Sequence, residues 1–198
     1  MSRMSHVACR MSHVACRMSH VACLQDKARR IFRKAEMPGH FSSVRAVAVT
    51  RDGQGGQYII SGSDDNLVKV WSVASKSLVS TCEGHTDDVN AVAAMPDGQR
   101  ILSGSVDMTV RVWLLNGTLE NTFELHTDIV SALVALPDNQ HALSGSYDHT
   151  VKLFNVNDGA VLRTFTHHAN PVRCLALLPD GLRFVSGSYD HTAGIAYH

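Results

Sequence analysis

The pentapeptide Ser-Gly-Ser-x-Asp occurs four times in register, as SGSDD at residues 61–65, SGSVD at 103–107, SGSYD at 144–148 and SGSYD at 186–190. A His lies at a nearly fixed distance before each copy, at His40, His85, His126 and His168. Successive His residues are 45, 41 and 42 positions apart, and the longer first period contains an extra Gly-rich stretch at residues 53–56. A period of this length indicates a repeat architecture.

Each period has the pattern of short β-strands rather than helices. The second period shows apolar or alternating segments at residues 89–94, 100–105, 110–113 and 118–123. Pro96-Asp97-Gly98 and Asn116-Gly117 mark turns between these segments. Four short antiparallel strands in about 40 residues predict an all-β protein made of propeller blades.

These repeats resemble the WD40 family. The resemblance rests on Gly39-His40 and Gly84-His85, on the Ser-Gly-Ser-x-Asp turns, and on Trp71 and Trp113, each six residues after the turn Asp. It covers about residues 38–198 and implies a WD40-type β-propeller with four recognisable blades, incomplete or truncated. The family's final Trp-Asp pair is altered in every copy, to Trp71-Ser72, Trp113-Leu114 and Phe154-Asn155, and the Gly-His pair becomes Leu125-His126 and His167-His168.

The heptamer repeats, the basic stretch that follows them and the longer repeats divide the chain into three parts. Residues 1–28 form a low-complexity tail of heptamer repeats, and residues 29–38 form a basic linker or a closing strand. Residues 39–198 form the repeat domain, with blades at about 39–83, 84–124, 125–166 and 167–198.

Ser, His and Asp recur in every period, and these are the residue types of a nucleophilic triad. Four equivalent triads are not expected in one hydrolase, so no catalytic residue is predicted. The resemblance implies instead that His bonds the turn Asp and that the strand Ser bonds both His and Trp. This structural set comprises His40, Ser61, Asp65 and Trp71; His85, Ser103, Asp107 and Trp113; His126, Ser144 and Asp148; and His168, Ser186 and Asp190.

The Trp position differs in the last two periods. Phe154 offers no indole N–H in the third, and Ala196 lacks a bulky anchor in the fourth, which predicts that the fourth blade is the least stable. Cys82 and Cys174 lie at strand positions and are predicted to be small core residues.

The repeat domain has no phosphate-binding Gly loop, no paired carboxylates with acid–base spacing and no cluster of metal ligands. We therefore expect a non-catalytic protein that has no metal or cofactor. The family resemblance favours a scaffold for protein–protein interaction and complex assembly, which binds other proteins or peptides. The alternatives are a substrate-recognition adaptor of a ubiquitin ligase and, less favoured, a propeller enzyme.

In the WD40 family, partners contact positions three and five residues after the repeat His and one residue before the turn Asp. Carried over, these positions hold Ser43, Arg45, Asp64, Asp88, Asn90, Val106, Ile129, Ser131, Tyr147, Pro171, Arg173 and Tyr189. Aromatic rings beside Arg and apolar residues are typical of binding hot spots, so Tyr147 and Tyr189 are the leading candidates.

Composition narrows the class of protein further. No apolar run approaches the ~18 residues of a membrane span, and five Cys in 198 residues favour a reducing compartment over a disulfide scaffold. Equal numbers of acidic and basic residues, 18 each, argue against a nucleic-acid binder. Residues 1–36 nevertheless carry eight basic and two acidic side chains. Cytoplasm or nucleus is the default location.

The tail repeats MSHVACR at residues 4–10 and 11–17 and MSHVACL at 18–24. The favoured interpretation is a disordered or weakly helical segment. An acid-free stretch with Arg and Ser is also compatible with an organelle transit peptide, such as a mitochondrial one. A third interpretation is zinc binding, by His6, Cys9, His13, Cys16, His20 and Cys23 at spacings of three and four.

Four blades is the low end for a closed propeller, and the fourth period stops within its third strand. Three explanations are open. The chain is a fragment of a longer WD40 protein, or two chains self-associate through incomplete propeller edges into an eight-blade ring. In the third explanation, residues 30–34 (RIFRK) supply the missing fourth strand of the last blade and close a four-blade ring.

Overall fold

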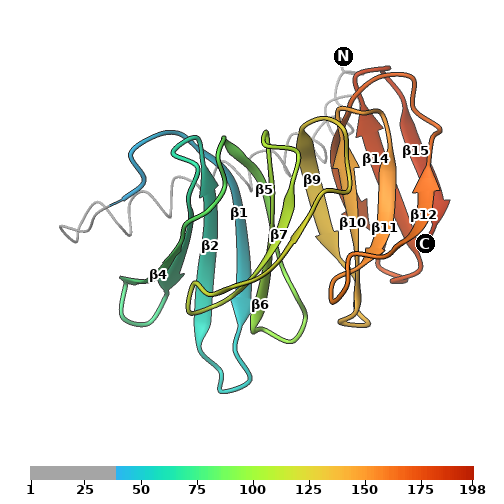
Figure 1. Ribbon diagram of the computed structural model, residues 1–198. Helices are drawn as coiled ribbons and strands as arrows, with labels where there is room; N and C mark the ends of the chain where they lie inside the picture. The colour runs from blue at the N-terminus through green and yellow to red at the C-terminus, as the bar shows by residue number, and fades with distance from the viewer. Residues whose placement is uncertain (1–38) are drawn as a thin grey trace, which may run out of the picture. The chain divides into compact units, whose positions relative to one another are not determined.

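The computed structural model describes residues 39–198, which form fifteen β-strands and no helix (Figure 1). The strands are β1 (Val44–Arg51), β2 (Gln57–Ser63), β3 (Val68–Ser72), β4 (Ser77–Cys82), β5 (Val89–Ala94), β6 (Arg100–Ser105), β7 (Val110–Leu114), β8 (Leu119–Phe123), β9 (Val130–Ala135), β10 (His141–Ser146), β11 (Val151–Asn155), β12 (Val161–Phe165), β13 (Val172–Leu177), β14 (Arg183–Ser188) and β15 (Ala193–Tyr197). In this part of the chain, therefore, no helix is long and apolar enough to cross a membrane.

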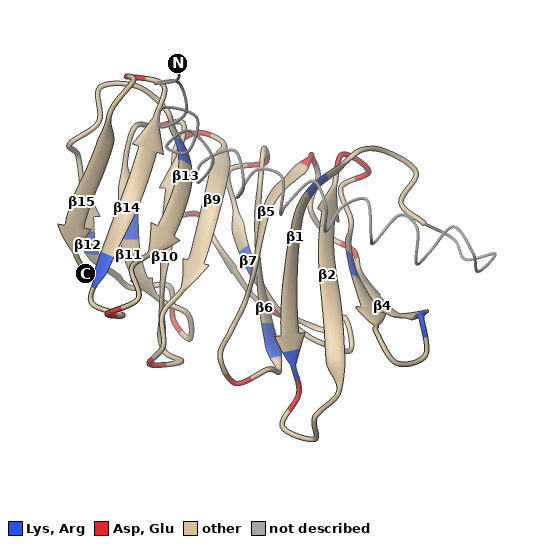
Figure 2. Ribbon diagram, turned by 180° about the vertical axis from the view of Figure 1, so that it is seen from behind, with Lys and Arg blue, Asp and Glu red and all other residues tan. Residues whose placement is uncertain are grey.

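The strands form four antiparallel meanders, and the predicted all-β blade architecture is confirmed. The first blade is β1–β4, the second β5–β8 and the third β9–β12, while the fourth has the three strands β13–β15. The segments expected at residues 89–94 and 100–105 coincide with β5 and β6. Short turns join the strands and carry most of the acidic side chains (Figure 2).

The core of the domain lies between blades. The innermost strand of each later blade packs on the two inner strands of the blade before it: β5 on β1 and β2, β9 on β5 and β6, and β13 on β9 and β10. Each junction has its own apolar cluster, which includes Trp113 between the first two blades, Phe154 between the next two and Phe184 between the last two. Apolar area removed from water at these junctions is the main source of stability.

The Gly of each Ser-Gly-Ser segment sets how closely two blades approach. A Cβ atom at Gly62 would lie 2.6 Å from Val89 Cγ1, one at Gly104 would lie 2.5 Å from Val130 Cγ1, and one at Gly145 would lie 2.8 Å from Val172 Cγ1. These distances are too short for any side chain. Glycine at this position therefore lets the first Val of the next blade pack on the backbone.

The prediction for the two strand cysteines is half wrong. Cys82 is buried, and burial raises the pKa of its thiol to about 12. Cys174 is exposed instead, although its counterparts Ala91 and Ala132 are buried. Those two residues lie under the inner strand of a following blade, whereas the described residues place no blade over Cys174. The tail, its zinc hypothesis and residues 30–34 lie outside the described residues.

Candidate functional site

A relay of hydrogen bonds joins the central hairpin of each blade to the incoming loop. In the second blade, His85 Nδ1 lies 2.8 Å from Asp107 Oδ2, and His85 Nε2 lies 2.7 Å from Ser103 Oγ. Trp113 Nε1 donates to the same hydroxyl at 2.7 Å. The first blade has the same relay with Trp71 Nε1 at 3.0 Å from Ser61 Oγ.

The donor and acceptor roles in this relay follow from the indole. A Trp N–H can only donate, so the Ser hydroxyl accepts it and directs its own proton to His Nε2. The His is then neutral and carries its proton on Nδ1, from which it donates to the Asp carboxylate. Every buried polar atom of the relay thereby gains a partner.

The carboxylates at the end of the relay are held ionised. Burial alone would raise the pKa of Asp107, but hydrogen bonds from His85 and from the Thr109 side chain and backbone N–H outweigh it and hold the pKa well below its usual range. The pKa of Asp148 is lowered in the same way by His126 and Thr150. Burial lowers the pKa of His40, against the opposing effect of Asp65. A fixed anion and a neutral imidazole are the states that a structural relay requires.

The relay changes in the last two blades. His126 bonds Asp148 at 2.7 Å and Ser144 at 2.8 Å, with Phe154 buried where the indole would be. In the fourth blade His168 bonds Asp190 and Ser186, both at 2.8 Å.

In the fourth blade a second imidazole takes the place of the indole. His167 Nε2 lies 2.8 Å from Ser186 Oγ, and its ring lies 4.3 Å from the His168 ring, centroid to centroid. With the His168 proton on Nδ1, facing Asp190, Ser186 donates to His168 Nε2 and accepts from His167 Nε2, as Ser103 accepts from Trp113 in the second blade. In the sequence, His167 stands out only as a change in the Gly-His pair, so this role was not predicted.

A small residue on the neighbouring strand makes room for His167. The position eight residues after the strand Ser holds Lys69, Arg111 and Lys152 in the first three blades and Gly194 in the fourth. A Cβ atom at Gly194 would collide with His167 Nε2, so a side chain there would force the imidazole to move from its place beside Ser186. The joint occurrence of His167, Gly194 and Ala196 is the sequence signal that could have revealed an imidazole in place of the indole.

Backbone hydrogen bonds assemble the candidate partner-binding face at the end of the blades where these turns lie. In every blade the residue before the turn Asp donates its N–H to the carbonyl three positions after the repeat His: Asp64 to Ser43, Val106 to Asp88, Tyr147 to Ile129 and Tyr189 to Pro171. The residue three positions after the repeat His and the residue before the turn Asp are therefore direct neighbours in each blade.

The first two blades make an acidic part of this face. Arg45 Nε donates to Asp64 Oδ1 at 2.5 Å, and its side chain remains half-exposed. Burial and the carboxylates of Asp64 and Asp87 raise the pKa of Asp88. Asn90 and Val106 are half-buried here.

The last two blades contribute two aromatic rings and a cation. The rings of Tyr147 and Tyr189 meet edge to face with centroids 6.1 Å apart. The Arg173 guanidinium lies 5.6 Å from the centre of the first ring and 5.3 Å from the second, and it donates to the Tyr147 hydroxyl. Tyr189 is 53% exposed, and among the described residues no acidic side chain forms an ion pair with Arg173.

The other positions on this face differ in accessibility. Ile129 and Pro171 are half-buried beside the two tyrosines. Ser131 is engaged within the protein, because its hydroxyl lies within hydrogen-bonding distance of the carbonyl oxygens of Gly145 (3.1 Å) and Val172 (2.5 Å). It therefore joins the third blade to the fourth and has less capacity to bind a partner than Tyr147.

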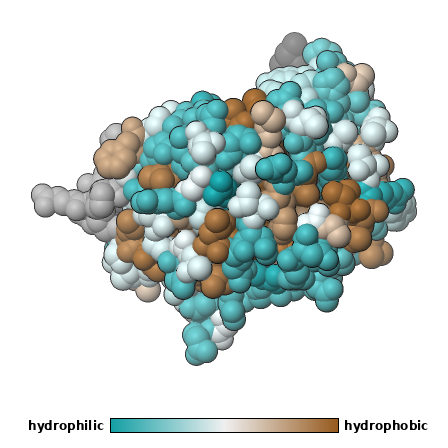
Figure 3. All heavy atoms as spheres, in the orientation of Figure 1, coloured by the Kyte–Doolittle hydropathy of each residue, from teal (hydrophilic) through white to brown (hydrophobic). Residues whose placement is uncertain are grey.

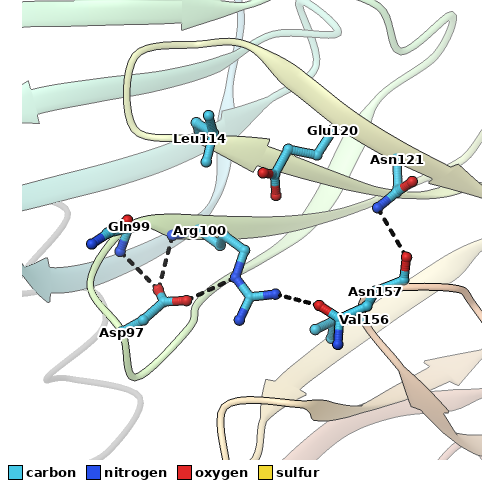
Figure 4. A pocket seen from close by; sticks show the side chains of 8 residues that line it. All are labelled: Asp97, Gln99, Arg100, Leu114, Glu120, Asn121, Val156 and Asn157. Carbon is cyan, nitrogen blue, oxygen red and sulfur yellow. Dashed lines mark hydrogen bonds and ion pairs between the residues drawn. The ribbon is translucent and has the colours of Figure 1, made fainter.

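A depression of ≈ 680 Å³ lies at the opposite end of the second and third blades (Figure 4). Its lining residues are Asp97, Gln99, Arg100, Leu114, Glu120, Asn121, Val156 and Asn157. Arg100 is fully engaged there by Asp97, by Asn157 and by the carbonyl of Asn139. The depression is thus a polar joint between blades with no free cation for an anionic ligand. Residues 39–198 contain no group of three His, Cys, Asp or Glu side chains placed to hold a metal.

Comparisons with known proteins agree with this architecture. The family model "WD domain, G-beta repeat" matches residues 32–72, 76–113, 117–155 and 159–195. The chain is 41% identical to Periodic tryptophan protein 2 of Arabidopsis thaliana over 75 residues, 38% of this chain and 8% of that protein. It is 32% identical to the Ribosome biogenesis protein WDR12 homolog of Drosophila mojavensis over 84 residues, 40% of this chain and 20% of that protein.

A solved structure shares the fold over a larger share of the chain. The computationally designed Ika4 protein superimposes with a TM-score of 0.70 and 28% identity, over 82% of this chain and 95% of that one. The chain spans a fifth or less of the length of the two natural relatives named above. The family model covers most of the 198 residues, and the chain belongs to the WD40 repeat family.

Proposed function

We propose that this protein is a non-catalytic scaffold that binds other proteins through the Tyr147–Arg173–Tyr189 cluster. The observation that carries the proposal is the guanidinium lying over two tyrosine rings on an accessible face. Tyr and Arg are the residues in which binding energy concentrates at protein interfaces. Arg173 has a charge free for a partner's carboxylate, and the rings offer an adjacent apolar contact.

Two further observations support a role in complex assembly. The relatives include a protein named for ribosome biogenesis. The Ser, His and Asp side chains of each blade are committed to structural relays, which leaves no nucleophile–base pair free for catalysis at these positions. A location in the nucleus or cytoplasm fits such a role.

The test is a double substitution, Tyr147→Ala with Tyr189→Ala, in the full chain. Each ring is expected to contribute about 2 kcal/mol, or roughly 30-fold in affinity, to a partner held at this cluster. Crosslinking and quantitative mass spectrometry would compare the proteins bound by wild type and variant. Leu119→Ala, an exposed change on β8, is the matched control. An unchanged set of bound proteins, with an unchanged melting temperature, would remove the cluster from the binding site.

A further inference from the structure

The three junctions between blades repeat one contact, which provides a template for a fourth. At each junction the Gly of a Ser-Gly-Ser segment receives the first Val of the next blade: Val89 on Gly62, Val130 on Gly104 and Val172 on Gly145. All three valines are fully buried. The contact is apolar and needs only a Val side chain close to the backbone of a Gly. It can therefore form wherever a blade face with the Gly meets a blade face with the Val.

The fourth blade presents the Gly half of this contact, and no blade of residues 39–198 packs on it. Within that part of the chain, a Cβ atom at Gly187 would meet only Cys174 Sγ within 4 Å, on the neighbouring strand of its own sheet. Ile195 lies on the same face and is 67% exposed, while its counterparts Val70, Val112 and Leu153 are buried. Among the described residues, this face has apolar side chains of core type in contact with solvent.

The first blade presents the Val half. Val44 lies four residues after His40, as Val89, Val130 and Val172 lie four residues after their own His. Val44 and Val47 are only half-buried, and Val49 is 65% exposed on the same strand, β1. Among residues 39–198, no pair of strands from the first and fourth blades packs to the extent seen at the three junctions. Figure 3 shows apolar groups scattered among polar ones on the side of the molecule that it draws.

We propose that a second copy of this chain occupies the open face of the fourth blade, with its Val44 packed on Gly187. The second copy fits because its first blade carries the residue type, in the register, that three existing junctions use. The same docking made twice joins two chains head to tail. Eight blades then close into a ring, because a heterologous contact forms a closed assembly when its rotation returns to the start.

This proposal is independent of the Tyr147–Arg173–Tyr189 cluster. That cluster lies at the end of the blades that carries the Ser-Gly-Ser-x-Asp turns, and the proposed contact uses the open sheet faces of the first and fourth blades. Its first test measures the mass of the full chain in solution by analytical ultracentrifugation across a wide range of concentration. A dimer is expected. A monomer at all concentrations, or a series of larger open assemblies, would overturn the ring.

Two single substitutions test which faces meet. Val49→Asp and Ile195→Asp lie on exposed positions of opposite end blades, so both should leave the fold intact and weaken the dimer at least tenfold. Leu162→Asp, at an exposed position on β12, is the matched control and should remain dimeric. Loss of the dimer in only one of the two variants would show pairing of like blades and contradict the head-to-tail arrangement.

Two further measurements separate failed docking from failed folding. Mixing the Val49→Asp and Ile195→Asp chains should restore some dimer, since one junction then has two unaltered faces. The Cys174 thiol should react slowly with iodoacetamide in the wild-type dimer and faster in Ile195→Asp, as read by peptide mass spectrometry. Equal reaction rates in the dimer and in the variant would exclude Cys174 from the junction and overturn the proposed contact.

Discussion

The second and fourth blades place different side chains beside the hydroxyl of the strand Ser. In the second, an indole fills the space and donates to the strand Ser, and Gly84 precedes the repeat His. In the fourth, the residue before the repeat His is His167, and its Nε2 atom lies 2.8 Å from Ser186 Oγ. The comparison teaches that a second group on the Ser hydroxyl need not be a Trp at one position, and the third blade keeps its His–Asp and His–Ser bonds with Phe154 at that position.

The largest expected effect comes from removing the indole in the second blade. Trp113 is 1% exposed, so Trp113→Ala should lower the free energy of unfolding by about 3–5 kcal/mol through the cavity and the lost N–H. Urea unfolding at fixed protein concentration is the measurement. Ala196→Gly, at the matching position of the fourth blade, should cost only about 0.5–1 kcal/mol. A loss below about 1 kcal/mol for Trp113→Ala would show that the indole is not the anchor of its blade.

An intermediate effect tests whether His167 and Gly194 are coupled. Gly194→Lys restores the cation of the first and third blades but collides with His167, and it should cost about 1–3 kcal/mol. In a His167→Gly background the collision is absent, so the same change should cost less. A double-mutant cycle by urea unfolding should give a coupling energy of about 0.5–3 kcal/mol. Additive effects would mean that the two positions adapt independently.

The smallest effect concerns pH. Burial, and after it the electrostatic interaction with the adjacent His168 ring, lowers the pKa of His167 from its ordinary 6.5. Below pH 6.5 the unfolded chain takes up a proton that the folded chain resists, so stability should fall with acidification until the lower folded pKa is passed.

His167→Gly removes this contribution, whereas the similar contribution of His40 stays in both proteins. Urea midpoints measured from neutral pH downward should therefore fall less steeply in His167→Gly than in wild type over this range. Parallel curves for the two proteins would show that His167 titrates alike in the folded and unfolded states.

Repetition made much of the fold predictable. A turn signal and an alternating strand recur in each period, so the bounds of β5 and β6 follow from residues 89–94 and 100–105 alone. The proximity of two candidate positions in each blade was also predictable, because the residue three positions after the repeat His and the residue before the turn Asp are joined by a backbone bond in every blade. That these positions bind a partner stays a prediction.

Contacts between residues far apart in the sequence were less predictable, both within a blade and between blades. Cys174 has an apolar strand position, and only the arrangement of blades shows that no described residue covers it. His167 acts through space on Ser186, nineteen residues away, and its pattern becomes visible only when Gly194 and Ala196 are considered together. Ser131 had the spacing of a partner contact, yet its hydroxyl is engaged with backbone carbonyl oxygens across two strands.

The Gly that seats a Val from the next blade has a consequence for how such chains grow. Each repeat carries the Gly on one face and the Val on the other, so tandem duplication of the coding segment adds a blade whose junctions use the same contact. Blade number is then a matter of copy count and of curvature, and selection can act on the loops of each copy while the joints stay unchanged.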